Sequence, residues 1–121
     1  MATLEDGLYV LEKNLRNKAF VDKMARFLRA SIKGWKYAAD HPDEAADIVL
    51  ENDDRGSQTE KHQRRMMREI NKLVGNQPQC FGYLIPADYN RTVKVLMSSD
   101  STPVITKKPK GAWSHIIWDA M

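Results

Sequence analysis

The stretch RFLRASIKGWKYAADHPDEAADIVL (residues 26–50) predicts two helices joined by a sharp corner. Over residues 20–39, apolar side chains recur every three or four positions, which is the spacing of one face of an α-helix. Pro42 marks the corner, because proline is tolerated in the first turn of a helix and breaks a helix elsewhere. The apolar side chains of residues 45–50 then form the inner part of the second helix.

Three residues indicate where the first predicted helix begins, where it could be approached closely and which side is buried. Asn17 is a good N-cap, since its side chain can accept a hydrogen bond from the first helical turn. Gly34 lies inside the helix at a cost of about 1 kcal/mol relative to alanine, and we interpret it as a point where another backbone approaches closely. Trp35 belongs to the periodic apolar face and is expected to be buried.

A third helix is predicted to follow a polar loop. Ser57 and Glu60 match the capping-box pattern, in which a serine and a glutamate three residues later satisfy the first amide groups of a helix. The helix is expected to end near Val74, before Gly75. Its apolar face contains Met66, Met67, Ile70, Leu73 and Val74.

A fourth helix and a tail complete the chain. Residues 86–88 (Pro-Ala-Asp) open the helix, and residues 102–110 are expected to be extended because Pro103 and Pro109 exclude a helix there. Residues 112–120 can form a last helical turn or two. The side chains expected to face inward are Tyr89, Val93, Leu96 and Met97 in the fourth helix and Trp113, Ile116 and Ile117 in the last.

The length of 121 residues fits one small domain. We therefore predict a mainly α fold over residues 1–121, with four to five helices and short extended segments, in which residues 102–121 form an extended tail with a short terminal helix. The single cysteine, Cys80, excludes an intrachain disulfide and is expected to be buried or half-buried.

Charge is unevenly distributed along the sequence. Residues 1–60 carry 9 basic and 12 acidic side chains, whereas residues 61–121 carry 10 basic and 4 acidic ones. A basic half can indicate nucleic-acid binding, but no recognition motif accompanies it. We interpret the densest basic stripe as solvated surface and expect no nucleic-acid partner; it comprises Arg64, Arg65, Arg68 and Lys72.

The sequence lacks the usual motifs of catalysis and cofactor binding. It has no phosphate-binding glycine loop, no HExxH pattern and no cysteine cluster. The histidines His41, His62 and His115 lie in different segments, and His115 is expected to have a packing or capping role. Neither Ser31 nor Thr92 has a nearby base in sequence that would activate it. We expect no enzyme activity, no cofactor and no metal.

Targeting signals are also absent from the sequence as written. Residues 1–14 mix acidic and basic side chains and have no continuous apolar core, so they do not form a secretory signal peptide. No apolar run reaches the roughly 18 residues that span a bilayer. The chain as written is expected to be cytoplasmic, without membrane insertion.

Several short motifs, in order, carry a resemblance to a known family. Together they resemble the C-terminal region of solute-binding proteins of ABC importers, of the nitrate/sulfonate/taurine and thiamine-precursor (hydroxymethylpyrimidine-type) group. The resemblance covers nearly the whole chain. Its motifs are FLRA (27–30), KGW (33–35), HPDEAAD (41–47), HQRRM (62–66), GYL (82–84), PADY (86–89), RTV (91–93), TKKP (106–109) and GAWSH (111–115).

The resemblance implies a two-lobed α/β protein of the periplasm that closes on a small solute and delivers it to a membrane permease. This chain lacks the strands of the first lobe and most loops of the cleft, and none of its residues matches a ligand-contact motif. The expected function is therefore a part, or a derivative, of such a solute-binding component. The alternatives are a stand-alone helical module that binds protein and, less favoured, a small enzyme of the thiamine-precursor type.

Helices that cover a sheet keep an apolar face when the sheet is absent. We therefore expect this chain to form a homo-oligomer, with helix exchange between two copies as one route. The side chains expected to form the packing or self-association face are Phe27, Ile32, Trp35, Met66, Ile70 and Trp113.

Overall fold

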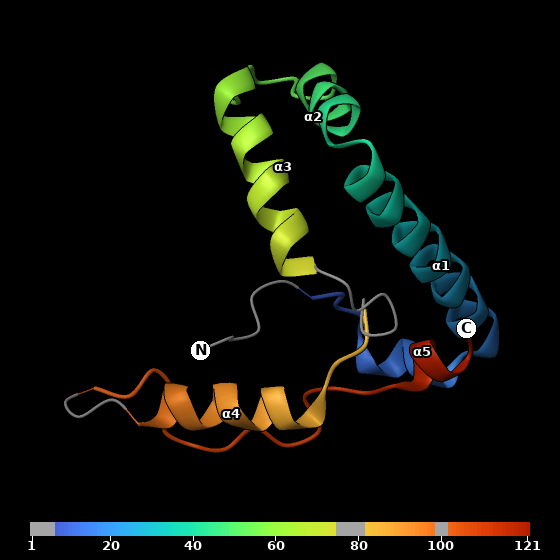
Figure 1. The fold of residues 1–121 in the computed structure, drawn as a ribbon. Helices are drawn as coiled ribbons and strands as arrows, with labels where there is room; N and C mark the ends of the chain where they lie inside the picture. The colour runs from blue at the N-terminus through green and yellow to red at the C-terminus, as the bar shows by residue number, and fades with distance from the viewer. Residues whose placement is uncertain (1–6, 75–81, 99–101) are drawn as a thin grey trace. The chain divides into compact units, whose positions relative to one another are not determined.

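The computed structural model describes residues 7–74, 82–98 and 102–121, and these residues form helices and irregular segments without a strand (Figure 1). The prediction of a mainly α fold with four to five helices is confirmed. Cys80 and Gly75 lie outside the described residues. The elements are the 3-10 helix η1 (Glu12–Arg16) and the α-helices α1 (Lys18–Asp40), α2 (Pro42–Glu51), α3 (Glu60–Val74), α4 (Pro86–Met97) and α5 (Ile116–Asp119).

Helix α1 begins at the predicted cap. The backbone N–H of Phe20 donates to Oδ1 of Asn17 at 3.2 Å, and the N–H of Val21 donates to the Asn17 carbonyl at 3.0 Å. Val21, Ala25 and Leu28, spaced by four and three residues, are buried. The N-cap therefore acts as the sequence predicts. The apolar face predicted for residues 20–39 is buried only in part, because Phe27 is 52% exposed while Val21 and Ala25, which lie outside that face, are buried.

Two expectations for the middle of α1 are wrong. A Cβ atom added at Gly34 would meet no atom of the described chain within 4 Å, so no backbone approaches closely there. Trp35 remains 39% exposed rather than buried. An amphipathic period identifies the apolar side of a helix, but how deeply each position is covered depends on its neighbours in space.

Replacing Gly34 with alanine is expected to raise the free energy of unfolding by about 1 kcal/mol, because alanine costs less backbone entropy inside a helix and has room for its methyl group. Urea unfolding followed by circular dichroism measures the change. Gly56 is the matched control: it also has open space around it, but its φ is +58°. Gly56→Ala should lower the unfolding free energy by about 1 kcal/mol, and a loss of stability in Gly34→Ala would contradict the open environment at that position.

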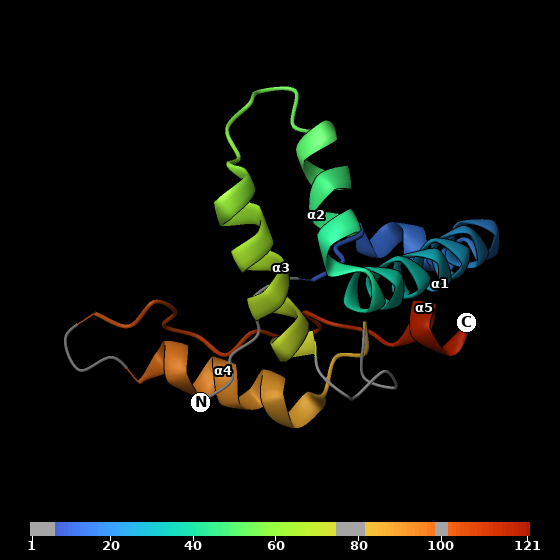
Figure 2. The same ribbon diagram turned by 45° about the horizontal axis from the view of Figure 1, so that its top comes forward.

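Helices α2 and α3 pack against each other as a hairpin (Figures 1 and 2). Pro42 occupies the first position of α2, as predicted. The buried residues of this pair are Ala45 and Ala46 on α2 and Met67 on α3. Ala45 and Ala46 are buried where larger side chains would need more room.

The start of α3 differs from the predicted capping box. Helix α3 begins at Glu60, and Oγ1 of Thr59 accepts a hydrogen bond from the N–H of His62 at 3.3 Å. The hydroxyl of Ser57 donates to Asp53 instead. Thr59 is therefore the N-cap, because the Asp53 carboxylate holds Ser57 within the preceding loop.

The N-terminal and C-terminal segments contain the remaining elements. The short helix η1 was not predicted. Helix α4 buries Val93, whereas Met97, expected to face inward, is 39% exposed at the last turn. Beyond α4 the chain runs back beside this helix (Figures 1 and 2), and the N–H of Ile105 donates to the carbonyl of Leu96 at 3.3 Å.

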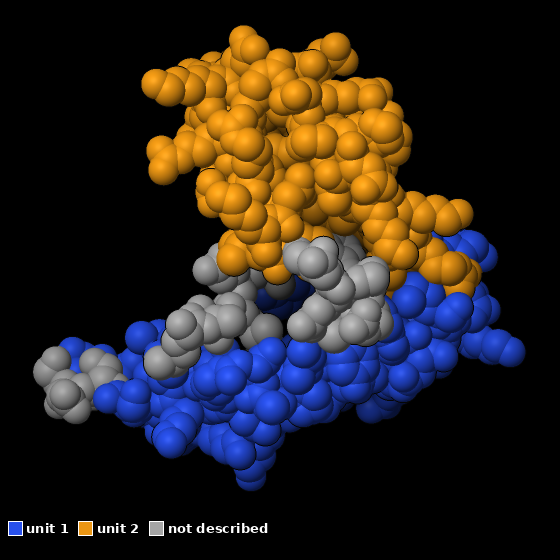
Figure 3. Space-filling model, viewed as in Figure 1, with its two compact units in different colours: residues 1–26, 82–121 blue, residues 27–81 orange. Residues whose placement is uncertain are grey.

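The chain divides into two compact units (Figure 3). Unit 1 contains residues 1–26 and 82–121, and unit 2 contains residues 27–81. Unit 2 holds the hairpin of α2 and α3 together with the second half of α1. That residues 1–121 act as one domain, with a tail over residues 102–121, stays a prediction.

Candidate interaction surface

Buried apolar side chains in the described residues are few. The buried set contains three alanines, and no large side chain is less than 2% exposed. A chain of this length normally buries about two-thirds of the surface of its unfolded state. Many large apolar side chains remain exposed instead. The main candidates for a functional site are therefore interaction surfaces formed by these side chains. Those in unit 2 are Phe27, Trp35, Tyr37, Ile48, Val49, Met66 and Leu73.

Five of the six side chains predicted to form a self-association face lie in unit 2. Phe27 is 52% exposed and Met66 is 43% exposed, whereas Ile32 and Ile70 are half-buried. Met66 and Ile70 are one turn apart on α3, so they share a side of that helix. Leu73 extends the same side and is 75% exposed. The exposed apolar surface of α3 thus includes Leu73, which the predicted self-association face did not, and its role in self-association stays a prediction.

Trp113, the sixth side chain, lies in an aromatic cluster of unit 1. Its ring is 6.2 Å from that of Tyr89 and 4.8 Å from that of His115, measured between centroids. His115 also stacks on Tyr83 at 4.2 Å, and its Nε2 atom lies 2.8 Å from the carbonyl oxygen of Leu84. Trp113 and His115 therefore pack within their own unit, although Trp113 stays 38% exposed.

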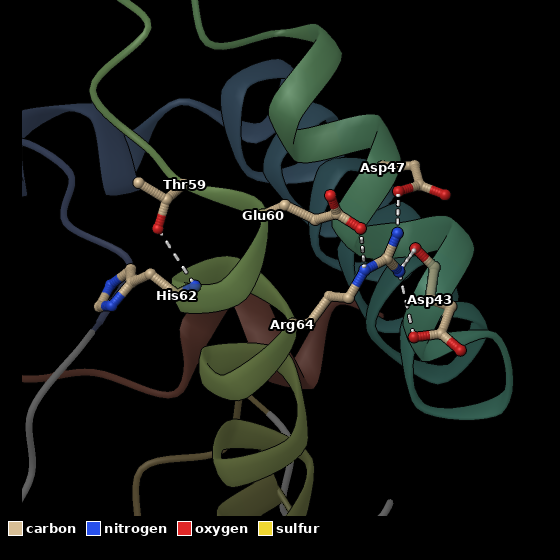
Figure 4. Close-up of polar contacts among 6 residues, drawn as sticks. All are labelled: Asp43, Asp47, Thr59, Glu60, His62 and Arg64. Carbon is tan, nitrogen blue, oxygen red and sulfur yellow. Dashed lines mark hydrogen bonds and ion pairs between the residues drawn. The ribbon is translucent and has the colours of Figure 1, made fainter.

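Arg64 is the main polar link between α2 and α3 (Figure 4). Its guanidinium group contacts Oδ1 of Asp43 at 3.1 Å, Oδ1 of Asp47 at 2.7 Å and Oε1 of Glu60 at 3.0 Å. The hydrogen bond to Glu60, followed by the negative charges nearby, raises the pKa of Arg64 above its usual value. The interpretation of this residue as part of a solvated basic stripe is wrong, because the stripe's first arginine turns toward α2.

A second polar contact lies at the corner between α1 and α2. The hydroxyl of Tyr37 donates to Oε2 of Glu44 at 2.7 Å, and this hydrogen bond raises the pKa of the tyrosine. The ring of Tyr37 also stacks on His41 with 4.4 Å between centroids. In addition, Nδ2 of Asn71 on α3 donates to the carbonyl of Ala38 at 3.3 Å. These contacts connect the three helical segments of unit 2.

The loop between α2 and α3 is organised by Asp53. Its carboxylate accepts hydrogen bonds from the N–H of Gln58 at 2.6 Å and from the N–H of Arg55 at 3.3 Å. The hydroxyl of Ser57 donates to the same carboxylate. These donors, Gln58 foremost, lower the pKa of the Asp53 carboxyl below its ordinary value. The loop therefore depends on a charged Asp53.

Asp53→Asn is expected to lower the urea midpoint at neutral pH, and the difference from the parent should disappear in acid. Because the pKa of Asp53 is lower in the folded chain, the carboxylate stabilises the fold above the unfolded pKa, and this stabilisation is lost as the pH falls through the folded pKa. Urea titrations between neutral pH and pH ~3 test this. Asp54→Asn is the control on the adjacent exposed residue, and an equal loss in both variants at neutral pH would contradict the role of Asp53.

The hydroxyl groups considered as nucleophiles are engaged with their own helices. The Ser31 hydroxyl donates to the carbonyl of Phe27 at 3.0 Å, and the Thr92 hydroxyl donates to the carbonyl of Asp88 at 2.9 Å. A hydroxyl bonded to the carbonyl four residues earlier is a common helix contact. Neither arrangement positions a nucleophile beside a base.

A shallow apolar groove of about 450 Å³ lies in unit 1. The segment before and within η1 forms one side, and residues 111–117 form the other. Tyr9 is 87% exposed and Leu8 is 54% exposed at its rim.

Within residues 7–74, 82–98 and 102–121, no three His, Cys, Asp or Glu side chains are grouped to hold a metal ion. In the same ranges, no helix has the length and apolar character needed to cross a bilayer.

No family model matches the chain, and neither the curated proteins nor the solved structures contain a significant match.

Proposed function

We propose that the chain is part of, or derived from, the solute-binding component of an ABC importer for a small organic solute of the sulfonate, taurine, nitrate or thiamine-precursor type. The observation that carries the proposal is the helix–corner–helix of residues 27–47, which carries the strongest motifs of the resemblance. In these residues α1 ends at Asp40 and α2 begins at Pro42, where the motif places its corner.

The exposed apolar side chains of unit 2 support the same proposal. A helical layer that covers the lobes of a binding protein needs an apolar side facing them, and Phe27 and Trp35 provide one on α1. In this function the chain has no catalytic role and needs no cofactor. In the complete protein it acts in the periplasm, supports a solute cleft built mostly by other segments and meets the permease of the importer.

The DNA upstream of the Met1 codon tests this proposal. An open reading frame that continues for roughly 200 codons, enough for the missing lobes, and encodes strands, cleft loops and an export signal would support it. A stop codon directly upstream, with a ribosome-binding site before Met1, would contradict the proposal that the chain is part of a longer binding protein and would favour the stand-alone candidate.

The second candidate is a stand-alone helical module that self-associates and no longer takes part in transport. The exposure of Met66, at 43%, and of Leu73, at 75%, on one side of α3 favours this candidate, because isolated monomers rarely leave a contiguous apolar surface uncovered. The molecular mass in solution tests it. A mass that stays at 13.9 kDa at micromolar concentration would contradict self-association.

A further inference from the structure

Helices α1 and α2 carry opposite charges in adjacent stretches of the chain. Residues 23–36 contain five basic side chains and no acidic one, whereas residues 40–54 contain seven acidic side chains and no basic one. Residues 29–36 and 44–51 of these stretches both belong to unit 2. Unit 2 therefore presents a basic surface and an acidic surface of complementary charge.

The basic surface has a defined pattern on α1. Arg29, Ile32, Lys33 and Lys36, here called the basic quartet, lie at relative positions 0, 3, 4 and 7 and so share one side of the helix. The three charged residues are exposed, and Ile32 is half-buried. The quartet is thus one apolar side chain surrounded by three positive charges.

The acidic surface repeats this pattern on α2 with the opposite sign. Glu44, Asp47, Ile48 and Glu51, here called the acidic quartet, also lie at relative positions 0, 3, 4 and 7. Ile48 is 46% exposed. The side chain of Asp47 is still 53% exposed although its Oδ1 atom binds Arg64. The acidic quartet therefore presents three carboxylates around one isoleucine.

The two quartets match only when the helices are antiparallel. In that direction the relative positions reverse, and every charged residue meets an opposite charge while isoleucine meets isoleucine. A parallel alignment would instead place Ile32 opposite a carboxylate and Lys33 opposite Ile48. The antiparallel pairs are Arg29 with Glu51, Ile32 with Ile48, Lys33 with Asp47 and Lys36 with Glu44.

The quartets of one chain cannot form these pairs with each other. Only His41 separates α1 from α2, whereas antiparallel helix pairs need loops of about two to five residues. Helix α2 packs instead against α3, and Arg64 binds the two aspartates Asp43 and Asp47 on that side. A complementary partner surface must come from another molecule.

We propose that unit 2 of one copy pairs with unit 2 of a second copy about a two-fold axis, the basic quartet of each copy lying antiparallel to the acidic quartet of the other. This inference rests on the self-association described under the second candidate function. A two-fold arrangement forms both contacts at once and uses both quartets of each copy. The exposed ion pairs set register and partner choice, and burial of Ile32 and Ile48 drives association.

A charge-exchange experiment tests the pairing by analytical ultracentrifugation. In the first variant Arg29, Lys33 and Lys36 become glutamate, and in the second Glu44, Asp47 and Glu51 become lysine. Each variant alone should self-associate at least about tenfold more weakly than the parent, and an equimolar mixture should form a heterodimer. The single variants Arg29→Glu and Glu51→Lys repeat the exchange without changing Glu44 or Asp47, so the Tyr37–Glu44 and Arg64–Asp47 contacts are kept. Circular dichroism verifies that each variant is helical.

Helix α3 offers a matched control. Lys61, Arg65 and Arg68 are exposed, have the same 0, 4 and 7 spacing as the cations of the basic quartet, and lie in the same unit. Their replacement by glutamate changes the net charge equally, but it should alter self-association by less than about twofold because no isoleucine lies between them to meet Ile48.

The outcomes distinguish the pairing from self-association itself. The pairing is supported if the mixtures of complementary variants associate again and the α3 control variant associates as strongly as the parent. A parent chain that stays monomeric at micromolar concentration overturns both the pairing and self-association. A dimeric parent that is insensitive to reversal of the basic quartet, or equally sensitive to the α3 control, overturns the pairing alone.

Discussion

Met67→Ala is expected to lower the free energy of unfolding by about 3 kcal/mol, because removing a buried methionine side chain loses its burial and leaves a cavity. Met67 is the buried residue of α3 and is 8% exposed. Helix α3 packs against α2, so the cavity would form within the hairpin of unit 2. Urea unfolding at a low protein concentration measures the loss in the single chain.

The neighbouring methionine provides the control for this substitution. Met66 is 43% exposed, and Met66→Ala removes the same atoms from a position where they already contact water. Its unfolding free energy should stay within about 0.5 kcal/mol of the parent. Equal losses in the two variants would contradict the packing of α3 on its Met67 side.

Ala46→Leu is expected to lower the free energy of unfolding by about 2 kcal/mol, since extra methylene groups in a filled site force neighbouring side chains or helices to move. Ala46 has no exposed surface, and Ala45 beside it is 7% exposed. Leucine is as good a helix former as most residues, so the loss would come from packing rather than from helix propensity. Urea unfolding again gives the change in free energy.

Ala30→Leu on α1 is the control for overpacking. Ala30 is exposed, and the same enlargement there should change the unfolding free energy by less than about 0.5 kcal/mol. If Ala46→Leu were as stable as the parent, the filled packing around the buried Ala46 would be contradicted.

Most helix positions could be predicted from local sequence signals. The apolar period of residues 20–39, the cap at Asn17 and the prolines Pro42 and Pro86 indicate the helices α1, α2 and α4 close to their observed limits. These signals act within one or two turns of the chain, so they do not depend on distant residues. The start of α3 was less well predicted, because two hydroxyl residues, Ser57 and Thr59, both precede it.

The contacts between helices could not be predicted in the same way. Arg64 is one of several basic residues on α3, and nothing local indicates that it binds Asp43, 21 residues earlier in the chain. Burial shows the same limit, because Trp35 and Met97 continue apolar periods and yet remain 39% exposed. The depth to which a side chain is buried depends on the segments that cover its helix, and the apolar period of the helix itself carries no information about those segments.

The candidate interaction surface was predicted in part. Phe27 and Met66 were selected from their periodic positions, and both are exposed. Leu73 and Ile48 were missed as members of an exposed surface, because both continue apolar runs that predict burial. The complementary spacing of the two quartets was visible in the sequence, but their exposure and the single-residue corner between the helices became clear only from the structure.

The molecular mass of the chain in solution is the most direct test of the claim that its exposed apolar surface is covered by a second copy. Light scattering at micromolar concentration and moderate salt should give twice the 13.9 kDa of one chain. The dimer should weaken as salt is raised, because ion pairs between the quartets set its register. A mass of one chain under all these conditions would contradict the claim.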